Sequence, residues 1–140
     1  MQAFYAGAIL ISEQNLEIVR SVYEALARDE FPVEVLDPEI EYVNPVGAVE
    51  EGTRHGIPAF RKAVAELFEE WATWHMQPEQ LTAVGNQVAV VVRYRARGRA
   101  SGVELEGRES ALFTLREGKV VRYEWYHEPG DALRAAESRG

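Results

Sequence analysis

Cysteine is absent from this chain of 140 residues, which excludes disulfides, thiolate-bound metals and a cysteine nucleophile and fits a reducing, cytoplasmic location. No apolar run approaches the roughly 20 residues that a membrane-spanning helix needs, so we expect no membrane partner. Positive charge is scarce, because 15 Lys and Arg face 23 Asp and Glu for a formal net charge of -8. A chain with this charge repels a phosphate backbone, so we expect no nucleic-acid partner.

The sequence also lacks the motifs that mark common cofactors and nucleophiles. It has no GxSxG elbow, no glycine-rich phosphate loop and no dinucleotide-binding fingerprint. Its three histidines, His55, His75 and His127, are far apart and show no metal-ligand spacing. We therefore expect neither a cofactor nor a metal site.

What remains is the composition of one folded domain, with 46% apolar and 27% charged residues. The first residues, MQAFYAGAILI, are mildly apolar but lack the basic start and the long apolar core of a secretion signal. We expect a flexible or partner-packed N-terminal arm over residues 1–11 and a single domain over residues 12–140.

Three helical patterns occupy the first half of the chain. Ser12 can cap a first helix that ends near Arg28, and a short second helix over FPVEVLD ends where Asp37 precedes Pro38. Pro58 suits the first turn of a third helix. The apolar stripe of that third helix consists of Phe60, Val64, Leu67, Phe68, Trp71 and Trp74.

Strand patterns dominate the second half. EIEYVN alternates and is followed by a glycine-rich loop over residues 47–56. From Gln80 onward, four strand-like segments follow one another, QLTAVG, QVAVVVRYRARG, VELEGRESALFTLR and KVVRYEWYHE, with turn residues between them. A last short helix begins at Asp131. Helices followed by a strand meander indicate an α+β fold, in which helices pack on one face of a curved antiparallel sheet.

Strand residues two apart share a face, and this rule predicts a pocket. The predicted pocket face carries Tyr42, Asn44, Arg93, Arg95, Glu109, Trp125 and His127. An aromatic wall with a few convergent polar groups is typical of a small-molecule site. The predicted outer face carries Val90, Val92, Tyr94 and Tyr126, which is apolar enough to need covering, so we expect a homodimer.

Glu109 is the acid of greatest interest on this face. Burial would raise its pKa and suit it to general acid or base work, but it could instead pair across the hairpin with Arg93 or Arg95. His127 is either a base or a structural histidine. Trp71 and Trp74 are expected to be core or pocket wall.

The order of these segments resembles a known family. The helix and short helix, then EYVNPVG, RHGIPAFRKAVAELF and the hairpin FTLREGKVVRYEWYHEPGDAL, are similar to the SnoaL-like branch of the nuclear transport factor 2-like superfamily over roughly residues 12–137. The resemblance implies a cone-shaped roll of a strongly curved, mostly antiparallel sheet, with three helices enclosing an apolar pocket. It also implies relatives such as ketosteroid isomerases, limonene epoxide hydrolases, scytalone dehydratases and polyketide cyclases, and a homodimer.

The catalytic residues of those relatives match only in part. Tyr42 and Asn44 match the water-holding pair of the epoxide hydrolases, and Arg93 matches their arginine. Arg95 and Trp125, however, stand where the two catalytic aspartates of those hydrolases belong.

The ketosteroid isomerases match in part as well. Their proton-shuttling aspartate is replaced by Asn44 and their second acid by Ala111, and Tyr23 lies near their oxyanion-hole tyrosine.

The sequence therefore predicts a hydrophobic small-molecule pocket, and it leaves the activity open. One hypothesis is a cofactor-independent isomerase, cyclase, dehydratase or hydrolase, in which Glu109 or His127 moves a proton and Arg93 stabilises negative charge. The predicted substrate-binding residues are Tyr42, Asn44, Trp125, Tyr23, Trp71 and Arg95. The alternatives are a binding protein without catalysis and a dimeric interaction module with a filled cone.

Overall fold

The computed structural model describes residues 2–48 and 52–139, which form three helices, a short 3-10 turn and a six-stranded sheet. The helices are α1 (Gln2–Ala27), α2 (Ile57–Glu70) and α3 (Asp131–Arg139), and the 3-10 turn spans Val33–Val35. The strands are β1 (Leu36–Asn44), β2 (Gly52–His55), β3 (Trp71–Val84), β4 (Gln87–Gly98), β5 (Glu104–Arg116) and β6 (Lys119–Tyr126).

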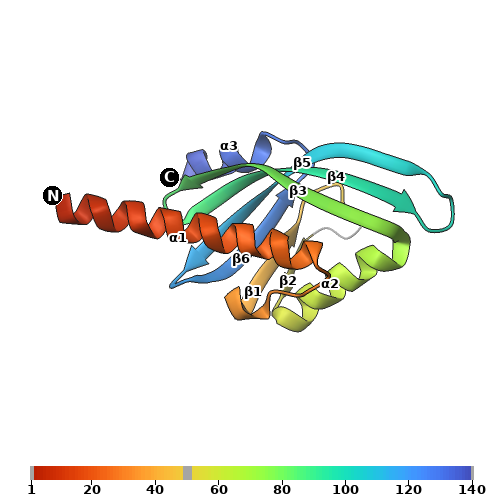
Figure 1. Cartoon of the computed structure of the whole chain (residues 1–140), viewed down its shortest axis with the longest axis horizontal. Coiled ribbons are helices and arrows are strands. Elements are labelled where there is room, and N and C mark those ends of the chain that lie inside the picture. The colour runs from red at the N-terminus through yellow and green to blue at the C-terminus, as the bar shows by residue number, and fades with distance from the viewer. Residues whose placement is uncertain (1, 49–51, 140) are drawn as a thin grey trace.

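The sheet has the order β2-β1-β6-β5-β4-β3 and is antiparallel except where β1 runs parallel to β6. Strands β3 to β6 form the predicted meander, while α1 and α2 cover one face of the curved sheet and α3 packs on the other (Figure 1). The predicted α+β cone is confirmed. No helix in the described part of the chain is long and apolar enough to cross a membrane.

The core lies between α1, α2 and the concave face of the sheet, and β4 shows how the faces divide. Val90 and Val92 are each 1% exposed and pack in this core, whereas Arg93 and Arg95 are exposed on the outer face. The prediction had these faces reversed. Apolar residues occupy both faces of the run VAVVV, so the alternation alone could not tell which face the helices cover.

The reversal removes the predicted outer apolar patch. Tyr94 lies on the concave side, where its ring stacks on Trp74 at 5.6 Å, and Tyr126 lies on the opposite face beside the helix α3. Val90, Val92, Tyr94 and Tyr126 therefore form no common surface for a partner subunit.

The helix boundaries also differ from the prediction. α2 ends at Glu70, so Trp71 and Trp74 lie on β3, where they pair with Gly98 and Ala96 of β4. The spacing of the two tryptophans fits a helix, but the cross-strand pairing and the ring stack on Tyr94 favour the strand.

Two further segments differ from the prediction. FPVEVLD forms only the 3-10 turn before β1, and β2 lies in the segment that was predicted to be a loop.

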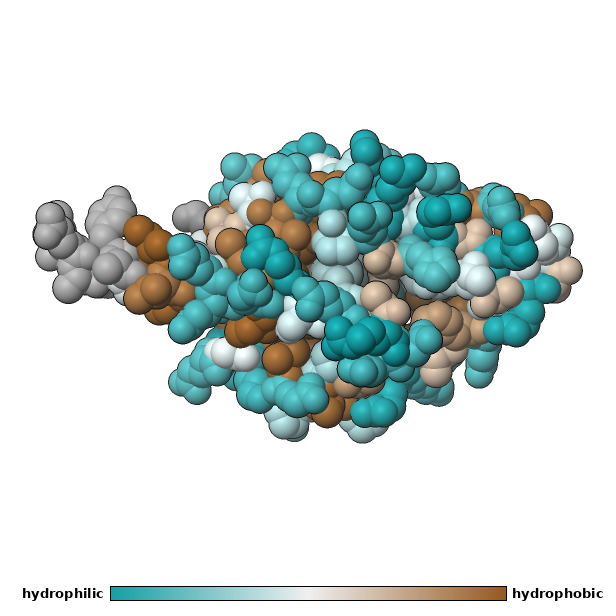
Figure 2. All heavy atoms as spheres, in the orientation of Figure 1, coloured by the Kyte–Doolittle hydropathy of each residue, from teal (hydrophilic) through white to brown (hydrophobic). Residues whose placement is uncertain are grey.

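Helix α1 begins at Gln2, not at Ser12, so the described part of the predicted arm continues the helix. Residues 2–11 contain no proline and no charge, and nothing in them stops a helix except the weak propensity of Gly7. This part of α1 extends beyond the sheet (Figure 1), and its exposed Ile9, Leu10 and Ile11 form an apolar patch on a mostly hydrophilic surface (Figure 2).

Helix α3 is fixed to the outer face by apolar and polar contacts. Ala132 and Ala136 pack against the sheet, and Ser110 Oγ donates to the Glu128 carbonyl at 2.6 Å and accepts from the Ala132 amide at 3.1 Å. Together these contacts attach the start of α3 directly to β5.

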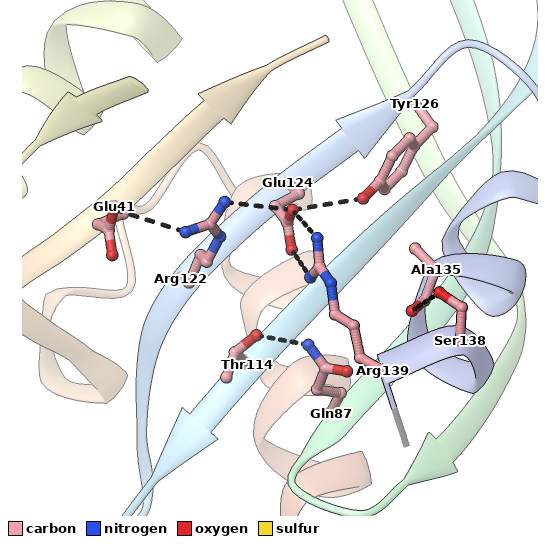
Figure 3. Close-up of polar contacts among 9 residues, drawn as sticks. All are labelled: Glu41, Gln87, Thr114, Arg122, Glu124, Tyr126, Ala135, Ser138 and Arg139. Atoms are coloured by element: carbon pink, nitrogen blue, oxygen red, sulfur yellow. Dashed lines mark hydrogen bonds and ion pairs between the residues drawn. The ribbon is translucent and has the colours of Figure 1, made fainter. Parts of the chain in front are cut away.

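The end of α3 is attached through the buried carboxylate of Glu124, which is 4% exposed (Figure 3). Arg139 donates to both of its oxygens, at 2.8 and 3.1 Å, and Arg122 and Tyr126 donate from the sheet at 3.4 and 3.3 Å. Burial alone would raise the pKa of Glu124, but the bonds from Arg139 and the charge of Arg122 outweigh it, so the pKa lies below its usual range.

We expect Arg139→Ala to lower the free energy of unfolding by about 1–2 kcal/mol at pH 7, because the buried carboxylate of Glu124 loses the guanidinium that bonds to both of its oxygens. The penalty should shrink in acid, as the pH falls through the lowered pKa of Glu124 and its carboxylate becomes protonated. Urea unfolding at pH 7 and across the acid range measures this. The control is Arg134→Ala, because among the described residues the side chain of Arg134 pairs only with Asp131, on the same helix. Equal penalties for the two variants would contradict the role of Glu124.

Candidate functional site

A cavity of about 470 Å³ lies between α1, α2 and the concave face of the sheet. Its walls are mostly aliphatic and aromatic, and the helices contribute Val22, Leu26, Ala63, Val64 and Leu67. This size and this lining are typical of a site for a small organic molecule.

Aromatic packing closes one end of the cavity. Phe60 of α2 packs edge-to-face on Tyr42 of β1 at 5.0 Å and on Tyr123 of β6 at 5.7 Å, and Phe113 packs on Tyr123 at 5.1 Å. These contacts hold the first turn of α2 against the sheet.

The exposed residues of the lining gather elsewhere and mark the mouth of the cavity. They lie at the end of α1 and at the junction between α2 and β3, and comprise Ala27, Asp29, Phe68, Ala72, Thr73 and His75. The cavity therefore opens to solvent between these two elements.

Glu109 lies inside the cavity, on β5 opposite Val92. Its carboxylate has no hydrogen-bond or ion-pair partner among the described residues, and burial raises its pKa to about 7. The alternative of a pair with Arg93 is excluded, because Arg93 lies on the other face and bonds to Glu106, with Nε at 3.0 Å from Oε1. Arg95 also lies on the outer face and makes no contact with Glu109.

Three tyrosine rings surround the same part of the cavity. Burial raises the pKa of Tyr42 to about 12 and also raises those of Tyr23 and Tyr123 well above the ordinary value, and the charge of Glu109 adds to all three shifts. Glu109 and the three tyrosines all line the cavity, and the rings of Tyr42 and Tyr123 stack with their centroids 5.3 Å apart. The phenols remain protonated at neutral pH, and the buried hydroxyl of Tyr23 has no hydrogen-bond partner among the described residues.

Asn44 is connected to this part of the cavity through its hydrogen bond with Trp125. Trp125, which lines the cavity, donates its indole N–H to Asn44 Oδ1 at 2.7 Å. Asn44 is not part of the lining. Its amide oxygen therefore orients the Trp125 ring.

Several predicted site residues lie outside the cavity. His127 is exposed, and its ring packs edge-to-face with that of Trp125, with the ring centroids 5.1 Å apart. Arg93 and Arg95 line a separate hollow of about 320 Å³ on the outer face with His75 and Gln77. Their predicted place on the pocket face was wrong. Trp71 is not in the lining either, whereas Trp74 is.

Tyr123 was missed as a site residue, although it shares a strand face with Trp125 and precedes it by two residues. That spacing could have identified it. Of the predicted residues, Glu109, Tyr42, Trp125 and Tyr23 line the cavity. Within the described ranges, no group of three or more His, Asp or Glu side chains could hold a metal ion.

Residues 19–123 match the family of SnoaL-like domains. The chain belongs to the SnoaL-like family. The resemblance inferred from the sequence is therefore confirmed. A comparison with curated proteins gives no match.

Solved structures of the nuclear transport factor 2-like fold are similar along most of their length. A protein of unknown function from Burkholderia pseudomallei K96243 is 21% identical with a TM-score of 0.75, and the match covers 86% of this chain and 95% of that one. A protein from Burkholderia thailandensis E264 is 25% identical with a TM-score of 0.74, covering 90% and 97%. TerC, co-crystallised with polyporic acid, is 19% identical with a TM-score of 0.74, covering 89% and 98%.

We expect Glu109→Gln to change how stability depends on pH. The pKa of Glu109 is about 7 in the folded protein against an ordinary 4.5, so the folded state favours the protonated carboxyl. The wild type should therefore lose about 2–3 kcal/mol relative to Glu109→Gln as the pH rises from about 4.5 to 8, because ionisation places an unpaired charge in the cavity.

Urea unfolding across this pH range measures the difference. The matched control is Glu106→Gln, because Glu106 is exposed on the same strand and the bond and charge of Arg93 lower its pKa. A flat difference between the wild type and Glu109→Gln from pH 5 to pH 8 would contradict a raised pKa.

Proposed function

We propose that this SnoaL-like protein binds a neutral hydrophobic molecule in the cavity and catalyses proton transfer on it, with Glu109 as the general acid and base. The observation that carries this proposal is the Glu109 carboxyl inside a mostly apolar cavity: it is partly buried, has no partner among the described residues, and has a pKa near 7. A group with this pKa can both accept and donate a proton at neutral pH.

The reaction step follows from the groups around Glu109. The carboxylate removes a proton from the carbon beside a carbonyl group, the C–H electron pair moves into the carbon–carbon bond, and the carbonyl oxygen takes the negative charge. A phenol such as that of Tyr23 or Tyr42 donates a hydrogen bond to this oxygen, and the Glu109 carboxyl then returns the proton to carbon. Isomerases, cyclases and dehydratases share such a step, and the apolar walls strengthen each of these interactions by excluding water.

The charge of the cavity supports a neutral substrate. Its described lining contains no Lys and no Arg, and the only acidic side chains in it are Asp29 at the mouth and Glu109 inside. An anionic group next to Glu109 would lack a counter-charge and would add to the repulsion. Arg93 and Arg95 cannot supply that charge from the outer face.

Binding without catalysis is the second candidate. It is favoured by the position of His127, because an imidazole that could have relayed the proton lies outside the cavity. A homodimer and a cytoplasmic location remain predictions, and the homodimer no longer has the surface on which it was predicted.

The enzyme hypothesis predicts that the protein accelerates proton exchange beside the carbonyl of 2-tetralone, a neutral bicyclic ketone, as followed by NMR in deuterated buffer. The rate should rise with pH through an apparent pKa near 7, as Glu109 becomes the free base. Glu109→Gln should lower the rate by about 10²–10⁴-fold, because the amide accepts no proton. Tyr23→Phe, which removes only the hydroxyl, should lower it by about 10-fold or more.

The control is Glu106→Gln, which should leave exchange unchanged. Saturable binding of 2-tetralone by both the wild type and Glu109→Gln, with equal exchange rates, would contradict catalysis and favour binding alone. The absence of both binding and exchange across a panel of neutral aromatic ketones would contradict the proposal as a whole.

A further inference from the structure

The junction between α2 and β3 forms most of one side of the cavity mouth. Phe68, Ala72, Thr73 and His75 all lie on it. The helix passes directly into the strand there, because α2 ends at Glu70 and β3 begins at Trp71. Any movement of this junction therefore changes the width of the mouth.

A helix end of this kind leaves backbone carbonyls without intrahelical partners. At the end of α2, Arg99 of the hairpin between β4 and β5 donates hydrogen bonds to these carbonyls. Its Nη2 donates to the carbonyls of Phe68 at 2.8 Å and Trp71 at 3.5 Å, and its Nε donates to the carbonyl of Glu69 at 3.2 Å. The backbone amide of Arg99 also donates to the carbonyl of Glu70 at 3.2 Å.

Arg99 thus binds four consecutive carbonyls, 68 to 71, from a position about 30 residues further along the chain. Its positive charge also lies at the negative end of the helix dipole, which is the favourable arrangement. The planar guanidinium has several N–H donors in fixed directions, so it can reach several carbonyls at once, which an ammonium on a flexible stem does less well.

Backbone hydrogen bonds fix the hairpin that carries Arg99. The Gly98 amide donates to the Val103 carbonyl at 2.8 Å, and the Gly102 amide donates to the Gly98 carbonyl at 3.0 Å. The Ser101 side chain also lies close to Gly98, since an added Cβ at Gly98 would be 2.5 Å from Ser101 Oγ. The position of the Arg99 backbone relative to β4 is therefore well defined.

From these contacts we infer that Arg99 is a positioning residue that holds the α2–β3 junction in place and so limits the rate at which ligands enter and leave the cavity. The inference rests on the proposed function, because it assigns the cavity a ligand, but it concerns access and not the reaction. The hydrogen bonds of Arg99 go to carbonyls of the junction, so it acts on the mouth through the junction.

The chain offers a matched control in Arg97, two residues earlier on β4. The Arg97 side chain is 57% exposed and pairs with Glu104 across the hairpin at 2.7 Å. Its backbone pairs with Thr73 of β3, but among the described residues its side chain makes no hydrogen bond or ion pair to α2 or to the start of β3. Arg97→Ala removes an arginine of the same hairpin and leaves the junction untouched.

The experiment compares the wild type with Arg99→Ala, Arg99→Lys and Arg97→Ala by two measurements. Hydrogen exchange of the backbone amides of residues 67–73 reports on the junction without any ligand. Stopped-flow fluorescence with N-phenyl-1-naphthylamine, a neutral apolar probe, reports the association and dissociation rates of the cavity.

We expect Arg99→Ala to raise amide exchange in residues 67–73 and both probe rates by about fivefold, which is the effect of losing roughly one net hydrogen bond. The probe Kd should change little, because the inner lining is intact. Arg99→Lys should lie between Arg99→Ala and the wild type, and Arg97→Ala should match the wild type.

Two results would overturn the inference while leaving the proposed function intact: unchanged amide exchange in Arg99→Ala, or raised exchange with unchanged probe rates. Equal effects of Arg97→Ala and Arg99→Ala would also overturn it, since the hairpin as a whole would then be responsible. A wild type that binds no probe would contradict both the ligand site and the role of its mouth.

Discussion

The packing of Phe60 against Tyr42 and Tyr123 is the interaction on which the arrangement of the site depends. It ties the start of α2 to β1 and β6 at one end of the concave face. The helix then runs to its other end at Glu70, and between these points the helices and the sheet leave the cavity open. α2 is thus attached at one end by a small aromatic cluster and at the other end by hydrogen bonds. The space between the two attachments remains open as the cavity, although protein interiors are normally close-packed.

The sequence was sufficient for the family, the α+β architecture and the place of Glu109, Tyr42, Tyr23 and Trp125 in the cavity wall. Those residues lie on strands or helices with a clear alternation or a clear apolar face. The sequence was not sufficient where one segment fitted two patterns, either two faces of a strand or a helix and a strand. In VAVVV of β4 both faces are apolar, so the pattern does not determine the face on which Arg93 lies, and the predicted face was wrong. Trp71 and Trp74 have helical spacing, yet pairing with β4 decides their structure. Such tertiary pairings override local pattern and cannot be read from one segment alone.

Charge is divided between the two faces of the sheet in a way that isolates Glu109. The outer face of β3 to β5 carries arginines and glutamates that satisfy one another in exposed pairs such as Arg97 with Glu104 and Arg108 with Glu79. Among the described residues, Glu109 on the concave face has no partner. Glu124 lies on the opposite face, where it is buried and bonded to Arg139 of α3. The two carboxyls therefore have opposite shifts in pKa, upward for Glu109 and downward for Glu124.

The alternation at residues 109 and 110 has a consequence for how proteins of this kind change over generations. Glu109 faces the cavity, whereas the next residue, Ser110, faces outward and bonds α3. The proposed proton transfer and the attachment of α3 thus depend on adjacent positions that point in opposite directions. A substitution at residue 109 changes the chemistry of the cavity while the bonds from Ser110 to the start of α3 remain. A designer could therefore vary this inward-facing position and keep the outer helix in place.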